Sequence, residues 1–491
     1  MSKKDQVHDS IFTSQMRNLL KRLFVASPIK DSLLDKATGF YRSQVTLPDI
    51  MEEFEQKKVN AEAEIAQGKG KTVERQQRIL DAIEEEREHH AQQLRSEREQ
   101  RLAHFNSLCD EILEMCEGHS FHETNRKSAQ VLGTIQLLSP CEGSRRPEVN
   151  EQHKPLYKAV LSLRLLDRLI LDNSVDDAYI NKVIGEITPD QYADLYEHDE
   201  EKHNRVLVDI KRSILTVALI QDIGNYHPDA RAILEGENGG LDPYRALEVE
   251  EKRALLQINF RESLKFLTEG LGIPSYRGDS KPERDAFNQN EQAKMAFMKG
   301  LLKKAVNPKN SIGNVIKVPQ IYTAITLSTK DSYNYKLIPK VYQALNQNAE
   351  HNHCSQLVVD ALYKVTGMFP QGFGITYIPI DAQGNSLERY EYAIVNALYP
   401  KNPEEPNCRI ATRQLCFIGY GTDLVIGKFE NTYFKESAER LAKISRERLL
   451  EILEQLVSNY TERAELDLIP RCWHAKDFFS IKTNQKLWNK A

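Results

Sequence analysis

The chain has 491 residues, a formal net charge of −5 at pH 7 and a charged fraction of 28%. One hydrophobic core rarely grows beyond about 300 residues, so we expect two or more structural units. The 40% hydrophobic content excludes an intrinsically disordered chain, and the near-neutral charge balance gives no general attraction for nucleic acid or for a membrane surface.

Sequence features that indicate a cellular compartment favour the cytoplasm. No apolar run is long enough to span a membrane as a helix, and the N-terminus lacks the apolar core of a signal peptide. The seven cysteines are scattered and form no CxxC pair, which favours reduced thiols over a disulfide framework or a zinc knuckle. We therefore expect a cytoplasmic protein without stable membrane insertion and without a nucleic-acid partner.

The first part of the chain predicts helices. Residues 1–48 form an N-terminal helical segment that Pro48 ends, and its basic amphipathic stretch, residues 16–24, is expected to pack on the protein's own body rather than on a membrane. Residues 49–118 then predict one long charged helix. Its weak seam of apolar residues at steps of three and four fits a coiled-coil homodimer and a helix lying across the same chain equally well.

A short glycine-containing segment interrupts this long helix. Gly68-Lys-Gly-Lys71-Thr72 resembles the end of a phosphate-binding loop, but Ile65 stands where that motif needs glycine, and no strand precedes it. The segment therefore predicts a flexible break in the helix.

The rest of the chain predicts a mainly α fold that ends in a small sheet. Residues 119–372 show repeated helical apolar spacing, as in a helical bundle. Residues 373–432 alternate apolar and polar residues around two turns, at 383–385 and 419–422, and predict a small antiparallel β region. Within residues 433–491 we expect one charged helix, residues 434–460, and a tail.

One apolar run stops abruptly in a way that suggests a site. Residues 214–220 are almost entirely apolar and are followed by Gln221-Asp222-Ile223-Gly224. A buried helix that ends in an acidic residue and a glycine can hold polar groups in a fixed geometry, because the packed body orients them.

Four segments in chain order resemble the HD-GYP family, a branch of the HD-domain metal-dependent phosphohydrolases whose active members hydrolyse cyclic di-GMP in bacteria. Residues 219–234 are similar to the LLHDIGK…PDxIL motif, and residues 250–267 to the helix that follows it. Residues 314–326 are similar to IIxVADxYDALT, and residues 357–372 to VVxALLxxLGxYPxGS. The resemblance covers residues ~200–400 and implies an HD-type helical bundle.

The same resemblance implies that the metal site of the family has been lost. Gln221 stands at the position of the HD histidine, while Asp222 is retained. Asn259 lies at the next histidine position, and Gln320 and Thr323 replace two aspartates. Neutral amides and hydroxyls are poorer ligands for iron or manganese than imidazoles and carboxylates. We therefore expect no catalytic residue, metal or cofactor; a retained metal would be iron or manganese.

Other polar residues offer weaker candidates. His203, His227 and Arg277 could line a ligand pocket at the former site. The group His351, His353 and Cys354 lacks a fourth zinc ligand nearby in sequence and is interpreted as a solvated turn.

These observations favour a catalytically inactive, HD-GYP-like regulatory protein of cyclic di-GMP signalling, with protein partners and a possible homodimer through the N-terminal helix. Two alternatives stay open. One is a divergent metal-dependent cyclic di-GMP phosphodiesterase that uses Asp222, His203 and His227. The other is a cyclic di-GMP receptor that binds the nucleotide without hydrolysis, with Arg277 near the pocket.

Overall fold

The computed structural model describes residues 9–309, 311–457 and 468–488. The chain forms two compact units. The unit called here the sheet unit comprises residues 1–21, 110–219 and 300–491, and the arm unit comprises residues 22–109 and 220–299. Among the residues described, no helix combines the length and the apolar composition that a membrane span requires.

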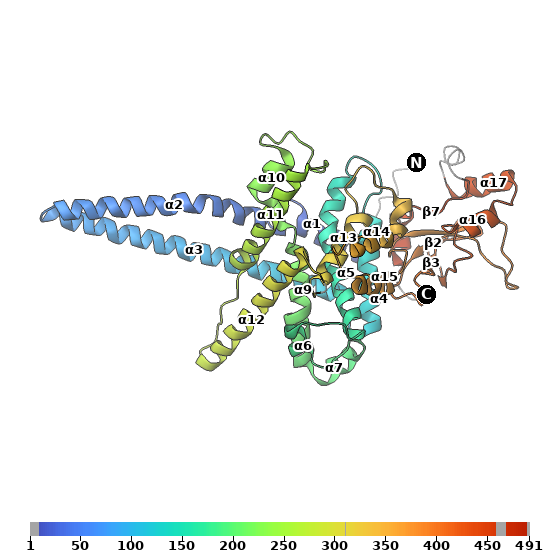
Figure 1. The fold of residues 1–491 in the computed structure, drawn as a ribbon, viewed down its shortest axis with the longest axis horizontal. Helices are drawn as coiled ribbons and strands as arrows, with labels where there is room; N and C mark the ends of the chain where they lie inside the picture. Colours follow the sequence, from blue (N-terminus) through green and yellow to red (C-terminus); the bar gives the residue numbers. More distant parts are fainter. Residues whose placement is uncertain (1–8, 310, 458–467, 489–491) are drawn as a thin grey trace. The chain divides into compact units, whose positions relative to one another are not determined.

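A helical hairpin, called here the arm, dominates the arm unit. Helices α2 (Leu33–Gln67) and α3 (Lys71–Cys116) run antiparallel and side by side (Figure 1). A capping box starts α2: the Ser32 hydroxyl accepts from the Asp35 amide at 3.1 Å, and the Asp35 carboxylate accepts from the Ser32 amide at 3.3 Å. The ring of Phe54 on α2 lies 6.2 Å from that of His90 on α3.

The arm corrects the prediction of one helix over residues 49–118. The chain reverses between Gly68 and Gly70, and Gly70 has a φ of +58°, which glycine adopts without steric cost. Two positions of the α3 seam, Gln76 and His90, contact Glu64 and Phe54 of α2 in the same chain. The predicted boundary at Pro48 is also wrong, since this residue lies inside α2, where buried side chains continue on both sides of it, at Tyr41 and Phe54.

The remaining arm-unit elements surround the base of α2. They are η3 (Ile223–Tyr226), α10 (Pro228–Glu235), α11 (Val249–Lys265), the π-helix η4 (Phe266–Leu271) and the first part of α12 (Lys281–Val306). The Phe40 ring packs edge-on against Phe266 at 5.7 Å. This aromatic contact fixes the start of α2 on the α11–η4 helix.

The sheet unit is built around a long buried helix, α5 (Arg146–Leu171). Residues 1–21 of this unit contain most of α1 (Ile11–Phe24). The helices that residues 110–219 contribute besides α5 are α4 (Phe121–Leu138), α6 (Ala178–Ile184), η1 (Pro189–Gln191), α7 (Tyr192–His198), α8 (Glu200–Arg205), the π-helix η2 (Val206–Lys211) and α9 (Arg212–Ile220). Later come α13 (Asn314–Thr326), η5 (Tyr335–Lys340), α14 (Val341–Glu350) and α15 (Gln356–Thr366). The α1 residues Met16 and Leu19 are buried, so this basic amphipathic helix packs within the protein.

The predicted C-terminal antiparallel sheet is confirmed. Its strand order is β6-β3-β2-β1-β7, with β1 (Gly374–Tyr377), β2 (Glu391–Val395), β3 (Asn407–Ile410), β6 (Asp423–Val425) and β7 (Cys472–Trp473). β1 and β2 pair as the turn at 383–385 predicted, with Gly374 opposite Ile394. A separate short ladder joins β4 (Thr412–Arg413) to β5 (Cys416–Phe417).

Two details of this region correct the sequence prediction. The two segments that flank residues 419–422 do not pair with each other, since β5 pairs with β4 and β6 pairs with β3. Gly421 lets the chain pass close to β3, because a Cβ at this position would lie 1.8 Å from the Ile410 carbonyl oxygen. The single helix predicted over 434–460 is divided into α16 (Lys435–Leu441) and α17 (Arg446–Leu456), because Ser445 caps a new start; residues 458–460 lie outside the described residues.

The tail also belongs to the fold rather than trailing from it. It supplies β7, α19 (Lys476–Phe479) and η6 (Lys482–Lys486), and both tryptophans, Trp473 and Trp488, are buried. The β region therefore extends beyond residues 373–432. Whether the helices form an HD-type bundle stays a prediction.

Candidate functional site

Two of the predicted site residues, Gln221 and Asn259, contact each other in the arm unit, at the turn of residues 221–224 that follows α9 and is called here the Gln221 corner. The Gln221 carbonyl accepts hydrogen bonds from Asn259 Nδ2 at 3.1 Å and from Ser263 Oγ at 3.2 Å. The Gly224 amide donates to Ser263 Oγ at 3.0 Å. Gly224 lies so close to α11 that a Cβ would be 2.3 Å from the Asn259 carbonyl oxygen. Within the arm unit, the turn at residues 221–224 is thus tied to α11 by direct hydrogen bonds.

His227 lies beside this corner and serves as a helix cap. Its Nδ1 accepts from the Asp229 amide at 3.2 Å at the start of α10, and its Nε2 lies 3.8 Å from Glu262 Oε2. The Tyr41 ring packs edge-on at 5.3 Å, and its hydroxyl donates to the Glu262 carbonyl at 3.1 Å. Burial, and then the Glu262 charge, raise the pKa of Tyr41. Asn259, Glu262 and Ser263 share one face of α11.

The other predicted site residues are distributed over both units. Asp222 is half-buried next to Gln221, and Arg277 is exposed in the loop between η4 and α12. Gln320 and Thr323 lie on α13, in the sheet unit; Gln320 is half-buried, and Thr323 is buried with a hydroxyl that has no hydrogen-bond partner among the described residues.

The histidine pair after α14 forms an exposed turn. The rings of His351 and His353 are 6.0 Å apart, and His351 Nδ1 lies 2.7 Å from the Gln347 carbonyl. Cys354 is buried, with its thiol directed at the Leu345 carbonyl at 3.9 Å. Over the described parts of the chain, no three His, Cys, Asp or Glu side chains lie close enough together to hold a metal ion.

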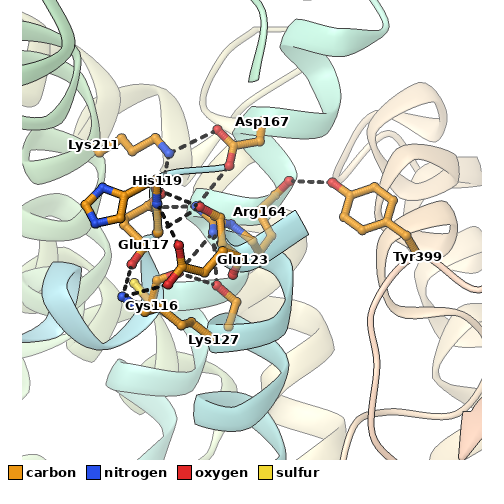
Figure 2. A network of polar contacts seen from close by, with 12 residues as sticks. Cys116, Glu117, His119, Glu123, Lys127, Arg164, Asp167, Lys211 and Tyr399 are labelled. Carbon is orange, nitrogen blue, oxygen red and sulfur yellow. Dashed lines mark hydrogen bonds and ion pairs between the residues drawn. The ribbon is translucent and has the colours of Figure 1, made fainter. Parts of the chain in front are cut away.

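The strongest concentration of charge is a network in the sheet unit that the sequence did not predict (Figure 2). Arg164 bridges Glu117 and Asp167, the latter at 2.9 Å. Lys211 Nζ lies 2.5 Å from Glu117 and 3.5 Å from Asp167. Arg164 and Asp167 are fully buried. Two carboxylates therefore meet two cations, and their formal charges cancel.

Local structure explains how these side chains meet. Glu117 directly follows α3, and Arg164 and Asp167 are one turn apart on α5. Lys211 is the last residue of the π-helix η2, whose wider turn changes the direction of the side chains that follow it. Arg164 also donates to Ser128 Oγ at 2.9 Å, and its own carbonyl accepts from the Tyr399 hydroxyl at 3.5 Å.

The network holds its two carboxylates in different electrostatic environments. Burial opposes the ionisation of Glu117, but the charges of Arg164 and Lys211 outweigh it and lower the Glu117 pKa. For Asp167 burial dominates and raises the pKa. Burial would lower the Arg164 pKa, but Glu117 and Asp167 reverse this and raise it. Such opposed environments occur in active sites and in structural ion networks alike.

An aromatic layer lies beside the network and includes His203. The Tyr196 ring is 4.1 Å from His119 and 5.3 Å from His203. Burial, followed by the nearby charge of Lys211, lowers the pKa of His203. His203 therefore belongs to the sheet unit, beside the network, whereas Gln221 belongs to the arm unit.

Sequence reasoning missed the network because its members lie on three separate segments with no fixed spacing. The one available signal was the pair Arg164 and Asp167 inside the apolar run of residues 156–170, where a charge needs a buried partner. The paired charges of the network can hold α5 and η2 to the residue that follows α3.

No protein-family model, curated protein or solved structure matches the chain. The resemblance to the HD-GYP family therefore rests on the four sequence segments alone.

Proposed function

We propose that the protein is a catalytically inactive, HD-GYP-like regulatory protein of bacterial cyclic di-GMP signalling that acts in the cytoplasm through protein–protein contacts. The hydrogen-bonded corner at Gln221 is the observation that supports this proposal most. There the main-chain carbonyl of Gln221 accepts hydrogen bonds from the Asn259 and Ser263 side chains.

The residues at this corner do not fit the metal centre of an active family member. A centre of that type needs several imidazoles and carboxylates with free lone pairs. Asp222 is the one carboxylate kept from the motif. The nearest imidazole, His227, uses Nδ1 to cap α10 and directs Nε2 toward Glu262. We therefore derive no reaction step through a metal.

The arm supports the second half of the proposal, which is action by docking. Between residues 45 and 95 only Phe54, Ala61 and Ile83 are buried, so most of the hairpin surface faces solvent. Val59 and Ile79 are 49% and 37% exposed. Because α2 of the same chain covers the α3 seam, a partner protein or a second copy would meet the outer face of the arm.

Metal content and turnover test the inactive state. We expect purified protein to contain no stoichiometric iron or manganese, to leave cyclic di-GMP intact, and to behave identically after Asp222→Ala. Bound iron or manganese that disappears in Asp222→Ala together with cyclic di-GMP hydrolysis would establish the phosphodiesterase instead. Tight cyclic di-GMP binding that Arg277→Ala abolishes would establish the receptor.

Photocrosslinking in cells tests docking through the arm. A photoreactive amino acid is placed at Val59 or Ile79, and at Leu337 as a control on the sheet unit with 47% exposure. We expect discrete crosslinked protein products from the two arm positions only. Equal labelling from Leu337, or none from the arm, would contradict docking through the arm.

A further inference from the structure

Strand β6 is an edge of the five-stranded sheet, and it is exposed along its whole length. It lies outside β3 in the strand order, and Asp423, Leu424 and Val425 are all exposed. Leu424 and Val425 expose 39% and 52% of their surface. Further exposed apolar residues lie close to β6 in the chain, namely Phe417, Tyr420 and Phe429, at 47%, 71% and 65%.

This edge lacks the charges that usually keep edge strands apart. From Gln414 to Gly427 the only charged residue is Asp423, although 28% of the whole chain is charged. The Asp423 carboxylate is held by Arg409 Nε at 2.6 Å and by Asn396 Nδ2 at 2.8 Å. Natural proteins commonly protect edge strands by short length, lysine, proline or inward-pointing charges. Strand β6 is short but carries no lysine or proline, so its exposed apolar edge can serve as a pairing surface.

The hydrogen bonds to β3 show which main-chain groups of β6 face outward. The Thr422 carbonyl accepts from the Ile410 amide, and the Ile426 amide donates to the Pro406 carbonyl, both at 3.1 Å. In an antiparallel strand, alternate residues direct both main-chain groups to the same side. Residues 422, 424 and 426 therefore face β3, and the amides and carbonyls of Asp423 and Val425 face away from the sheet.

We propose that the β6 edge of a second copy of this chain pairs with this edge, antiparallel, about a twofold axis at Leu424. In that register Asp423 lies opposite Val425 of the other copy, and each such pair exchanges both of its outward hydrogen bonds. The two Leu424 residues face each other as a pair without hydrogen bonds, and no like charges lie directly opposite. The edge is thus complementary to itself, as a twofold contact requires.

This contact is separate from the arm and goes beyond the proposed function. It needs neither the family resemblance nor the loss of a metal site. Because the strand is short, the contact is small, and small interfaces give weak, reversible association. The register is the specific part of the proposal, so the test must report on register.

Cysteine crosslinking tests the register. All variants carry Cys416→Ser, which removes the exposed native cysteine. The half-buried Cys141 is a poor nucleophile, since burial raises its pKa to about 12. In the proposed pair the Cα atoms at position 424 are about 4.5 Å apart, which a disulfide can span. The residues at 425 lie on a diagonal about 7–8 Å apart, at or beyond that reach.

We expect Leu424→Cys to form a covalent dimer under mild oxidation and Val425→Cys to form little, read on non-reducing gels. Equal crosslinking at both positions, or crosslinking at 425 alone, would overturn the register. Absence of crosslinking at both positions would overturn the contact itself.

Sedimentation of the full-length chain provides the matched measurement. The unmodified chain should show concentration-dependent dimerisation that Val425→Lys abolishes and Val425→Thr, which keeps a strand-forming residue, preserves. A monomer at every concentration would overturn the proposal and leave an extended segment of another protein as the occupant. A dimer that persists in Val425→Lys would also overturn it and would place self-association elsewhere, without affecting the test of the inactive state.

Discussion

Replacing Lys211 by methionine removes one cation from the buried network while keeping a side chain of similar length. The ammonium group lies 2.5 Å from Glu117 and 3.5 Å from Asp167, and Lys211 is 1% exposed. Without it, Arg164 still faces both carboxylates, and the buried network has lost one positive charge. Removing one partner of a buried ion pair costs about 3–5 kcal/mol, so we expect a loss of that size in the free energy of unfolding at pH 7.

The loss should depend on pH. Asp167 already has a raised pKa because of burial, and removal of Lys211 will raise it further. A carboxyl group whose pKa is higher in the folded than in the unfolded state stabilises the fold below its unfolded pKa and loses this contribution as pH rises through its folded pKa. The deficit of Lys211→Met relative to the unmodified protein should therefore be smaller at pH 5 than at pH 8.

Urea unfolding followed by tryptophan fluorescence measures this effect, because Trp473 and Trp488 both lie in the sheet unit. The double variant Glu117→Gln/Lys211→Met removes one charge of each sign, and we expect it to lose only about 1–2 kcal/mol, since no unpaired charge remains. The reasoning is refuted if Lys211→Met costs less than about 1 kcal/mol, or if the double variant is less stable than the single one.

Three further predictions concern single positions. Burial, and then the Arg17 charge, lower the pKa of His153 to about 4, so below pH ~6.5 this residue binds a proton in the unfolded chain but not in the folded one. The free energy of unfolding should therefore fall by about 2 kcal/mol between pH 7 and pH 5, and His153→Gln should remove this pH dependence in urea titrations. Gly224→Ala should destabilise the arm unit by about 2–4 kcal/mol in thermal unfolding followed by circular dichroism, because the added Cβ would collide with the α11 backbone. Gly39→Ala on α2 is the control: its Cβ would have no heavy atom within 4 Å, and alanine favours the helix, so we expect the arm unit to gain about 1 kcal/mol. Gly70→Val should destabilise the arm unit by about 1–2 kcal/mol in the same measurement, because valine is strained at the left-handed φ of +58°. A steric clash does not contribute, since the added Cβ would have no heavy atom within 4 Å. An unchanged melting temperature would contradict a fixed turn at the end of the arm.

The sequence and the structure agree where the signal is local. The alternation around residues 383–385 predicted antiparallel strands, and β1 and β2, which flank this turn, pair with each other. Neighbouring strands joined by a glycine-containing turn need few distant contacts to define them. The glycines at 68 and 70 predicted a break in the long helix. The reversal of the chain at that break could not be predicted, because it depends on whether the α3 seam finds α2 or another partner.

The candidate sites divide in the same way. Gln221 and Asn259 were singled out by resemblance, and the structure brings them together through a main-chain carbonyl that no motif encodes. The family assignment and the inactive state stay predictions. The edge of β6 combines both kinds of information: its lack of charge is visible in the sequence, whereas its position outside β3 is a property of the sheet.

The sequence by itself determined the mainly helical class, the small C-terminal antiparallel sheet and the end of the apolar run at Gln221. Periodicity, glycines and turns act over a few residues, and a single chain displays them directly. Only the tertiary structure decided that residues 49–118 fold back as an arm, and that Glu117, Arg164, Asp167 and Lys211 neutralise one another. Ion pairs between distant segments leave no periodic trace, because a buried charge requires a partner in space and not at any fixed distance along the chain.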